Sequence, residues 1–128
     1  MSSTDVGILK LAQARMAWAA NRQQVLAQNV ANASTPGYTP RDVAPFQAAL
    51  AQAGAPMERT SPLHLPGAAS PAAARAVRPS ERSPDGNAVS LDRELMKVAD
   101  TASTQDLAVS LHRKYQGMVR LALGRGGM

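Results

Sequence analysis

Histidines and carboxylates are the side chains of this chain that could bind a metal ion or transfer protons. The two histidines, His64 and His112, lie far apart in the sequence, and neither has a second ligand at the spacing that zinc sites use. Asp92 and Glu94 are too close together in the sequence and lie on different faces of a helix, so they do not form an acid–base pair. We assign both to capping in the first turn of a helix, where the helix dipole favours acidic side chains. The chain has no cysteine, which excludes disulfides, thiolate zinc sites and cysteine nucleophiles. We therefore expect no enzymatic activity, no metal and no cofactor.

The composition favours helices over a large hydrophobic core. Of the 128 residues, 45% are hydrophobic, but 25 are alanines, which have the highest helix propensity and bury little area. Aromatic residues, which bury large areas, are limited to Trp18, Tyr38, Phe46 and Tyr115. We expect a helical chain of at most one domain that depends on partners for much of its burial.

The net charge of +5 is spread along the chain. After Asp106 every Lys, Arg, Asp or Glu of the sequence is basic: these residues are Arg113, Lys114, Arg120 and Arg125. This bias complements the dipole at the C-terminal end of a helix. The aromatic residues do not interleave with the basic ones as a single-strand stacking surface requires. We therefore expect no nucleic-acid partner; a basic nucleic-acid-binding module is a minor alternative, which salt-dependent DNA binding would reveal.

Targeting segments are not evident in the sequence. No run approaches the ~18 apolar residues that a membrane span requires. Ala17-Trp18-Ala19 resembles a signal-peptide cleavage site, but Lys10, Gln13 and Arg15 interrupt the apolar region that should precede it. We expect no direct membrane span, and any export should use a route without a cleaved leader.

Residues 5 to about 33 are predicted to form a long helix, because they contain no proline and follow N-cap candidates at Ser3, Thr4 and Asp5. A heptad seam with spacings of three and four runs along it. Its members are Leu9, Ala12, Met16, Ala19, Gln23, Leu26 and Val30. A second stripe on roughly the opposite face consists of Leu11, Trp18 and Val25. Two stripes predict contacts with more than one neighbour.

The middle of the chain contains all nine prolines, between Pro36 and Pro84. This composition excludes a long helix or a regular sheet. Within it, Phe46 to Ala53 could form about two helical turns, and Leu63 to Leu65 a brief extended segment. Residues 67 to 82 have the composition of a flexible linker.

Residues 91 to about 123 are predicted to form a second long helix, with Ser90 as its N-cap and Gly124 at its end. Its seam consists of Leu91, Leu95, Val98, Ala102, Gln105, Val109, His112, Gln116, Val119 and Leu123. A second stripe consists of Leu107, Leu111, Tyr115 and Met118. At 1.5 Å per residue, each terminal helix would be roughly 40–50 Å long.

The predicted fold is all-α, with long N- and C-terminal helices packed as an antiparallel coiled-coil-like hairpin. We divide the chain into an N-terminal helix (residues 1–35), a mostly irregular, Pro-, Gly- and Ala-rich insertion (36–90) and a C-terminal helix (91–128). Because two striped helices cannot bury both faces within one chain, the isolated monomer should have largely disordered ends. The residues expected at an assembly interface are Leu9, Met16, Trp18, Leu26, Val30, Leu95, Val98, Val109, Leu111, Met118 and Val119.

The turn after the first helix is the most informative local feature. Thr35-Pro36-Gly37-Tyr38 fits a type II turn, which requires a positive φ at its third residue. It follows two asparagines, Asn29 and Asn32, three residues apart on one helix face. These asparagines either belong to a simple helix stop or hydrogen-bond across a helix interface and fix its register. The sequence alone leaves both interpretations open.

The pattern Asn-x-x-Asn-x-x-Thr-Pro-Gly-Tyr at Asn29 to Tyr38 resembles the signature of bacterial flagellar axial proteins, the rod and hook subunits. Further segments narrow the resemblance to the proximal-rod proteins, and they span nearly the whole chain in the right order. They are Arg22 to Asn29, Arg41 to Val43 with Phe46, Thr60 to Leu65, and Asp85 to Asp92.

The resemblance implies a structural subunit that is exported through the flagellar type III apparatus without a cleaved leader. It would assemble helically at the base of the rod, in the periplasmic space, through its terminal helices. Its partners would be copies of itself, other rod proteins, the base-of-rod adaptor FliE and the MS-ring protein FliF. The assembly would link the MS ring and export gate to the rest of the rod and transmit torque.

Two alternatives remain beside this interpretation. Another proximal-rod protein is the nearest, because the Thr-Pro-Gly-Tyr step is shared across the axial proteins. A coiled-coil adaptor or export chaperone is the other, but chaperones lack that step and tend to be acidic, whereas this chain has a pI near 10.5.

Overall fold

The computed structural model describes residues 3–54, 74–78, 84 and 86–124. Two long helices dominate them: α1 (Ser3–Ala31) and α3 (Leu91–Gly124). A shorter helix, α2 (Phe46–Gly54), and two-residue strands β1 (Arg41–Asp42) and β2 (Arg75–Ala76) lie between them in the sequence. The predicted all-α hairpin with an irregular middle is therefore confirmed. The predicted segment Leu63 to Leu65 and most of residues 67 to 82 lie outside the described residues.

Both long helices begin and end close to the predicted residues. Ser90 directly precedes α3, and its carbonyl accepts a hydrogen bond from the Glu94 N–H at 3.0 Å, as expected at an N-cap position. At the end of α1, the Asn32 N–H donates to the Gln28 carbonyl at 3.1 Å, which closes the last turn.

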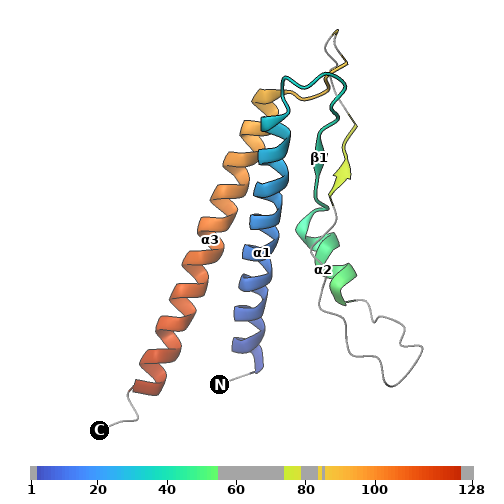
Figure 1. Ribbon diagram of the computed structural model, residues 1–128. Coiled ribbons are helices and arrows are strands. Elements are labelled where there is room, and N and C mark those ends of the chain that lie inside the picture. The colour runs from blue at the N-terminus through green and yellow to red at the C-terminus, as the bar shows by residue number, and fades with distance from the viewer. Residues whose placement is uncertain (1–2, 55–73, 79–83, 85, 125–128) are drawn as a thin grey trace, which may run out of the picture.

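The helix α1 lies between two neighbours (Figure 1). On one side α3 runs antiparallel to it, and on the other lies the segment of β1 and α2. This arrangement explains why α1 has two apolar stripes: Leu26 is fully buried, while Trp18 on the second stripe contacts Phe46 of α2. The expected second neighbour of α1 is therefore part of the same chain.

The small sheet was not expected from the proline-rich composition. β1 and β2 are antiparallel, with Arg41 opposite Ala76 and Asp42 opposite Arg75. The Val77 N–H extends the ladder by donating to the Pro40 carbonyl at 2.9 Å. The pairing is short enough to fit between prolines, since Pro40 needs only to accept a hydrogen bond here.

The buried residues concentrate at the end of the hairpin near the turn. In α1 they run from Ala19 to Asn29, and in α3 they are Glu94, Thr101 and Ala108. Figure 1 shows the two helices close together at this end and spread apart toward the two termini. The turn end is therefore the packed part of the described molecule.

Candidate assembly interface

Asn29 of α1 connects three other parts of the chain through one fully buried amide. Its Nδ2 donates to the Arg41 carbonyl at 2.6 Å and to Glu94 Oε2 at 2.8 Å. Its Oδ1 accepts from the Tyr38 hydroxyl at 3.2 Å and from the Arg41 N–H at 3.0 Å. These four bonds use both donors and both lone pairs of the amide. Asn29 thereby joins α1 to the turn, to β1 and to α3.

Glu94 is the residue that makes this connection possible, and it is only 2% exposed. Besides Asn29, it contacts Lys97 Nζ at 3.0 Å. A carboxylate buried this deeply requires such partners, because desolvating an unpaired charge is costly. Sequence reasoning assigned Glu94 to helix capping alone and missed its role between the helices.

The ion pairs continue from Lys97 to β1. Lys97 Nζ lies 3.8 Å from Asp42 Oδ2, and Asp42 in turn forms a two-pronged pair with Arg22 of α1, at 3.0 and 3.1 Å. Arg22 also lies 3.7 Å from the exposed carboxylate of Asp100. We call the connected residues Arg22, Asn29, Asp42, Glu94 and Lys97 the polar clasp. The clasp fixes the position of β1 and α3 on α1.

Asn32 has a different role from Asn29. Its Nδ2 donates to the Gln28 carbonyl at 2.8 Å, and its Oδ1 accepts from the Thr35 hydroxyl at 3.1 Å. Both partners are local, so Asn32 closes the helix end. Of the two interpretations left open, the inter-helix bond holds for Asn29 and the helix stop for Asn32.

The turn at Pro36 and Gly37 docks against the segment that leads into α3. Gly37 has a φ of 73°, and the Tyr38 N–H donates to the Thr35 carbonyl at 3.3 Å, as the predicted type II turn requires. Gly86 also has a positive φ, of 82°, and a Cβ on it would lie 3.7 Å from the Gly37 backbone.

Asn87 completes this docking. Its Nδ2 donates to the Ala33 carbonyl, and its Oδ1 accepts from the Val89 N–H at 3.0 Å. The Ala88 N–H donates to the Tyr38 carbonyl at 3.1 Å. The family-like segments around Asn29 and around Asp85 to Asp92 therefore meet in space, where Gly86 to Val89 contact the turn.

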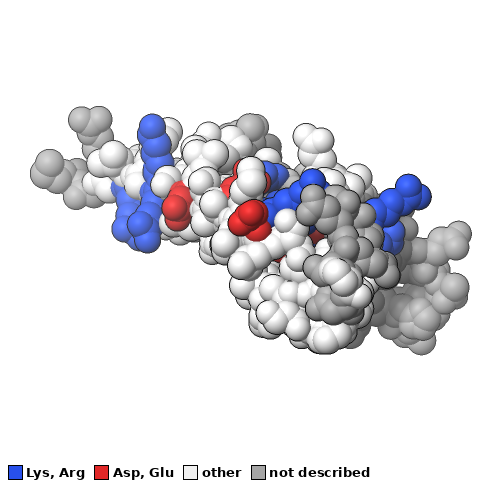
Figure 2. Space-filling model, turned by 90° about the horizontal axis from the view of Figure 1, so that it is seen from above, with Lys and Arg blue, Asp and Glu red and all other residues white. Residues whose placement is uncertain are grey.

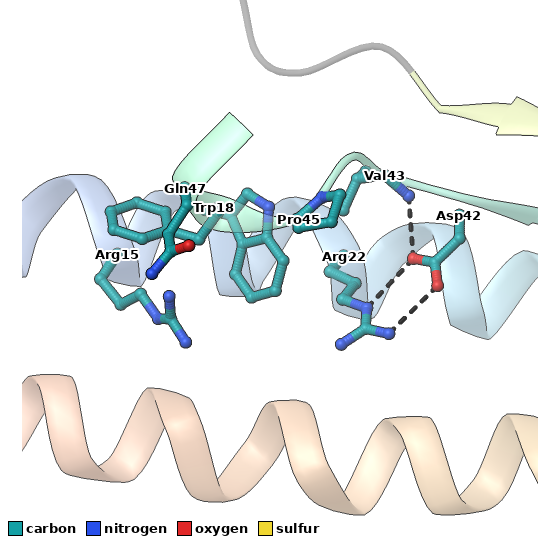
Figure 3. A pocket seen from close by; sticks show the side chains of 8 residues that line it. Arg15, Trp18, Arg22, Asp42, Val43, Pro45 and Gln47 are labelled. Atoms are coloured by element: carbon teal, nitrogen blue, oxygen red, sulfur yellow. Dashed lines mark hydrogen bonds and ion pairs between the residues drawn. The ribbon is translucent and has the colours of Figure 1, made fainter. Parts of the chain in front are cut away.

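Trp18 attaches α2 to the side of α1 on which β1 also lies. Its Nε1 donates to the Ala44 carbonyl at 2.8 Å, and its ring meets Phe46 edge-on with 6.0 Å between centroids. Figure 3 shows Trp18 between Arg15 and Arg22, whose guanidinium carbons lie 5.1 and 5.5 Å from its centroid. These cation–π contacts and the ring pair hold Trp18 inside its own chain.

The predicted interface residues fall into three groups by exposure. Leu26 is fully buried within the chain. The half-buried members are Leu9, Met16, Trp18, Val30, Val98, Val109 and Val119. The exposed members are Leu95, Leu111 and Met118, at 50%, 44% and 54%. Leu26 therefore belongs to the core of the hairpin, while the exposed group remains free to contact another chain.

The face that α3 turns toward α1 differs from the predicted seam. It is centred on Glu94, Thr101 and Ala108, each one residue before a predicted seam position. This face carries two polar residues and one small one, and its Glu94 reaches the buried amide of Asn29. Large apolar residues outside this face are exposed, among them Met96, Leu107, Leu111, Met118, Leu121 and Leu123.

The described residues show no arrangement suited to catalysis or metal binding. No group of three or more potential ligands gathers among them. His112 lies 3.5 Å from the side-chain nitrogen of Gln13, and His64 lies outside the described part. In the described helices, no segment combines the length and apolarity needed to cross a membrane. What the structure offers is a helical hairpin with exposed apolar side chains.

Comparison with known proteins identifies the class of this hairpin. Residues 9–39, which contain α1 beyond its start and the whole turn motif, match the family described as flagella basal body rod protein. The chain thus has the helix and turn of the flagellar rod proteins.

Full-length relatives give the particular family. The chain is 32% identical to the flagellar basal body rod protein FlgB of Agrobacterium fabrum, over 97% of this chain and 98% of that protein. It is 34% identical to FlgB of Salmonella typhimurium, over 91% and 93%, and 35% identical to FlgB of Escherichia coli, over 88% and 91%. The chain belongs to the FlgB family. It is a structural subunit of the proximal rod of the flagellar basal body and not an enzyme.

Proposed function

We propose that the chain assembles helically into the proximal rod through the outward faces of its terminal helices. In this role it links the MS ring and the export gate to the rest of the rod and transmits torque. Assembly with other rod components follows from membership of the family. FliE, FliF and the type III export apparatus as direct partners, and a periplasmic position reached without a cleaved leader, are part of the proposal.

The observation that carries this proposal is the exposure of large apolar side chains on α3 while α3 already packs on α1. Leu107, Met118 and Leu121 are 61%, 54% and 72% exposed. Each such side chain would gain ~1.5–3 kcal/mol on full burial, so the face favours contact with other chains.

The polar clasp supports the second part of the role, the transmission of torque. Torque passes through a subunit only if its helices do not slide on each other. Asn29 and the ion pairs of Asp42 tie α1, β1 and α3 together by directional contacts, which tolerate little displacement. The hairpin end is thereby suited to act as one rigid unit.

The test compares an exposed and a buried residue of the predicted interface. Met118→Asp should leave the helical circular dichroism of the purified chain unchanged but abolish swimming and remove the chain from isolated basal bodies. Leu26→Asp should instead lower the free energy of unfolding by about 3–5 kcal/mol, because it buries an unpaired charge. Gln47→Asp, on the exposed start of α2, is the control and should swim normally. Normal motility of Met118→Asp would contradict the proposal.

A further inference from the structure

Arg15 of α1 is a half-buried cation without a carboxylate partner among the described residues. Three lysine or arginine side chains of the described part are half-buried, namely Arg15, Arg22 and Lys97. Arg22 pairs with Asp42 and Lys97 with Glu94, each at 3.0 Å, whereas none of the ion pairs includes Arg15. Because it is costly to take an unpaired charge out of water, Arg15 should gain from a carboxylate that another chain supplies.

The guanidinium group of Arg15 lies at a pocket of about 370 Å³ between α1 and the segment from β1 to the start of α2. Its carbon lies 5.1 Å from the ring centroid of Trp18 and 4.6 Å from that of Phe46. The rings hold the cation in place but do not neutralise its charge. The acidic residue of the lining, Asp42, already pairs with Arg22, as the dashed lines in Figure 3 show.

The antiparallel packing of α1 and α3 explains why α3 of the same chain does not supply a carboxylate to Arg15. Arg22 lies 3.7 Å from Asp100 of α3. Arg15 is one heptad before Arg22, and Leu107 is one heptad after Asp100, so the equivalent position opposite Arg15 is a leucine. The position that gives Arg22 a carboxylate therefore gives Arg15 an apolar side chain.

Exposed leucines flank this cation along both helices. Leu11 lies one turn before Arg15 on α1, and Leu111 lies one turn after Leu107 on α3. Leu11, Leu107 and Leu111 are 47%, 61% and 44% exposed. We call these three leucines and Arg15 the Arg15 face. Its single cation among apolar side chains favours a helix that offers one carboxylate on an otherwise uncharged side.

Asp106 of α3 is a carboxylate without a partner in the described part of the chain. The other acidic residues described there have a local role. Asp42, Glu94 and Asp100 pair with basic side chains of the same chain, and Asp92 lies in the first turn of α3, where the helix dipole stabilises it. Asp106 is exposed in the middle of α3 and belongs to none of these ion pairs.

The outer side of α3, which points away from α1, carries Asp106. At ~100° per residue, Asp106 lies about 150° around the helix from the buried Thr101 and Ala108. Ser103 and Ser110 lie beside it on this side and are small and exposed, so another helix can approach closely. After Asp106 the charged residues of α3 are basic, and Figure 2 shows basic side chains gathered at the left end of the view. The outer side of this half of α3 therefore offers one carboxylate.

We propose that Asp106 of one copy binds Arg15 of the next copy, with the outer side of its α3 against the Arg15 face. This inference rests on the proposed helical assembly and specifies one contact within it. The two α3 helices are parallel and nearly in register, since Arg15 lies level with Leu107, one residue from Asp106. The outer side of α3 and the Arg15 face point in different directions, so one copy can use both. The contact is heterologous and can continue from copy to copy.

Exchange of the two charges tests this pair. The chain is expressed in the bacterium that encodes it, with the chromosomal gene deleted, and its amount in isolated basal bodies is measured. Arg15→Glu and Asp106→Arg should each reduce this amount at least about tenfold relative to wild type, because each places like charges together in every contact. The double variant, Arg15→Glu with Asp106→Arg, should restore most of it, since opposite charges then face each other again.

Arg78→Glu is the matched control, because it changes the net charge as Arg15→Glu does but is exposed in the insertion. It should behave as wild type. Asp106→Arg alters an exposed side chain, so its helical circular dichroism should equal that of wild type even if Arg15→Glu disturbs the fold. Normal incorporation of Asp106→Arg would overturn the contact, and together with loss of Arg15→Glu it would show that another protein supplies the carboxylate. Failure of the wild-type chain to restore swimming would overturn the proposed function itself.

Disulfide formation gives a second, independent readout, since the chain has no cysteine of its own. Leu11 lies level with Leu111, so the proposed contact brings Ser110 of one copy beside Leu11 of the next. Oxidised basal bodies that carry Leu11→Cys with Ser110→Cys should give a ladder beyond the dimer. Leu11→Cys with Ala99→Cys is the control, because Ala99 shares the outer side but lies about 16 Å away along α3, too far for a disulfide. No ladder from the first pair, or equal ladders from both, would overturn the proposal.

Discussion

At the residue scale, Asn29 stands out among the described residues. Its amide is fully buried and makes four hydrogen bonds, and one of its partners is a buried carboxylate. An asparagine fits this place because it offers two donors and two acceptors from one short side chain. An aspartate has the same shape but no donor, so the two residues should differ sharply here.

We expect Asn29→Asp to lower the free energy of unfolding by about 3–5 kcal/mol, since it places a second carboxylate beside Glu94 without solvent. Adding Glu94→Gln should recover at least about 1 kcal/mol, because the glutamine amide can donate to the new aspartate. Urea denaturation followed by circular dichroism measures both effects. Equal stability of the single and double variants would show that repulsion between the two carboxylates is not the cause of the loss.

At the element scale, the glycines of the turn and of α3 have opposite requirements. Gly37 has a φ of 73°, which side chains with a Cβ avoid, whereas Gly117 lies inside a helix with no atom close to its Cβ position. The turn depends on glycine for its backbone conformation. The helix does not.

We therefore expect opposite changes in stability from the same substitution. Gly37→Ala should lower the free energy of unfolding by about 1–2 kcal/mol, because it forces a Cβ into the left-handed region. Gly117→Ala should raise it by about 0.5–1 kcal/mol through helix propensity. Thermal unfolding of the two purified variants checks this, with Gly37→Asn as a control that should lose less. A neutral Gly37→Ala would contradict the turn assignment.

At the scale of the whole molecule, order should decrease from the hairpin end toward the termini. The buried residues and the polar clasp lie near the turn, and the helices spread apart away from it. The sequence predicts disordered ends because both apolar stripes of α1 need partners. The insertion covers part of the second stripe through the contact of Trp18 with Phe46, so we expect the disorder of the monomer to be confined to the ends far from the turn.

Hydrogen exchange on the dilute monomer should show this gradient. Amides of residues 19–29 and 94–108 should be the most protected, and those of residues 7–12 and 118–124 should exchange at least about tenfold faster, because few contacts oppose fraying there. Incorporation into basal bodies should slow exchange at both ends. Uniform protection along both helices in the monomer would show that assembly is not needed to order them.

The sequence by itself determined the two long helices, the type II turn and the family. Helix propensity, heptad spacing and the proline distribution are local properties, so they can be recognised without knowing the packing. The positive φ at Gly37 and the short helix from Phe46 were predicted for the same reason. The family could be recognised from the sequence because the order of its motifs along the chain can be read without a structure.

Only the tertiary structure decided which side of each helix faces its own chain. Periodicity indicates that a residue lies on a stripe but not which partner covers the stripe, so Leu26 and Met118 were assigned to one interface although one is buried and the other exposed. The structure also revealed the clasp, because Glu94 and Asn29 are 65 residues apart and nothing local marks a buried carboxylate.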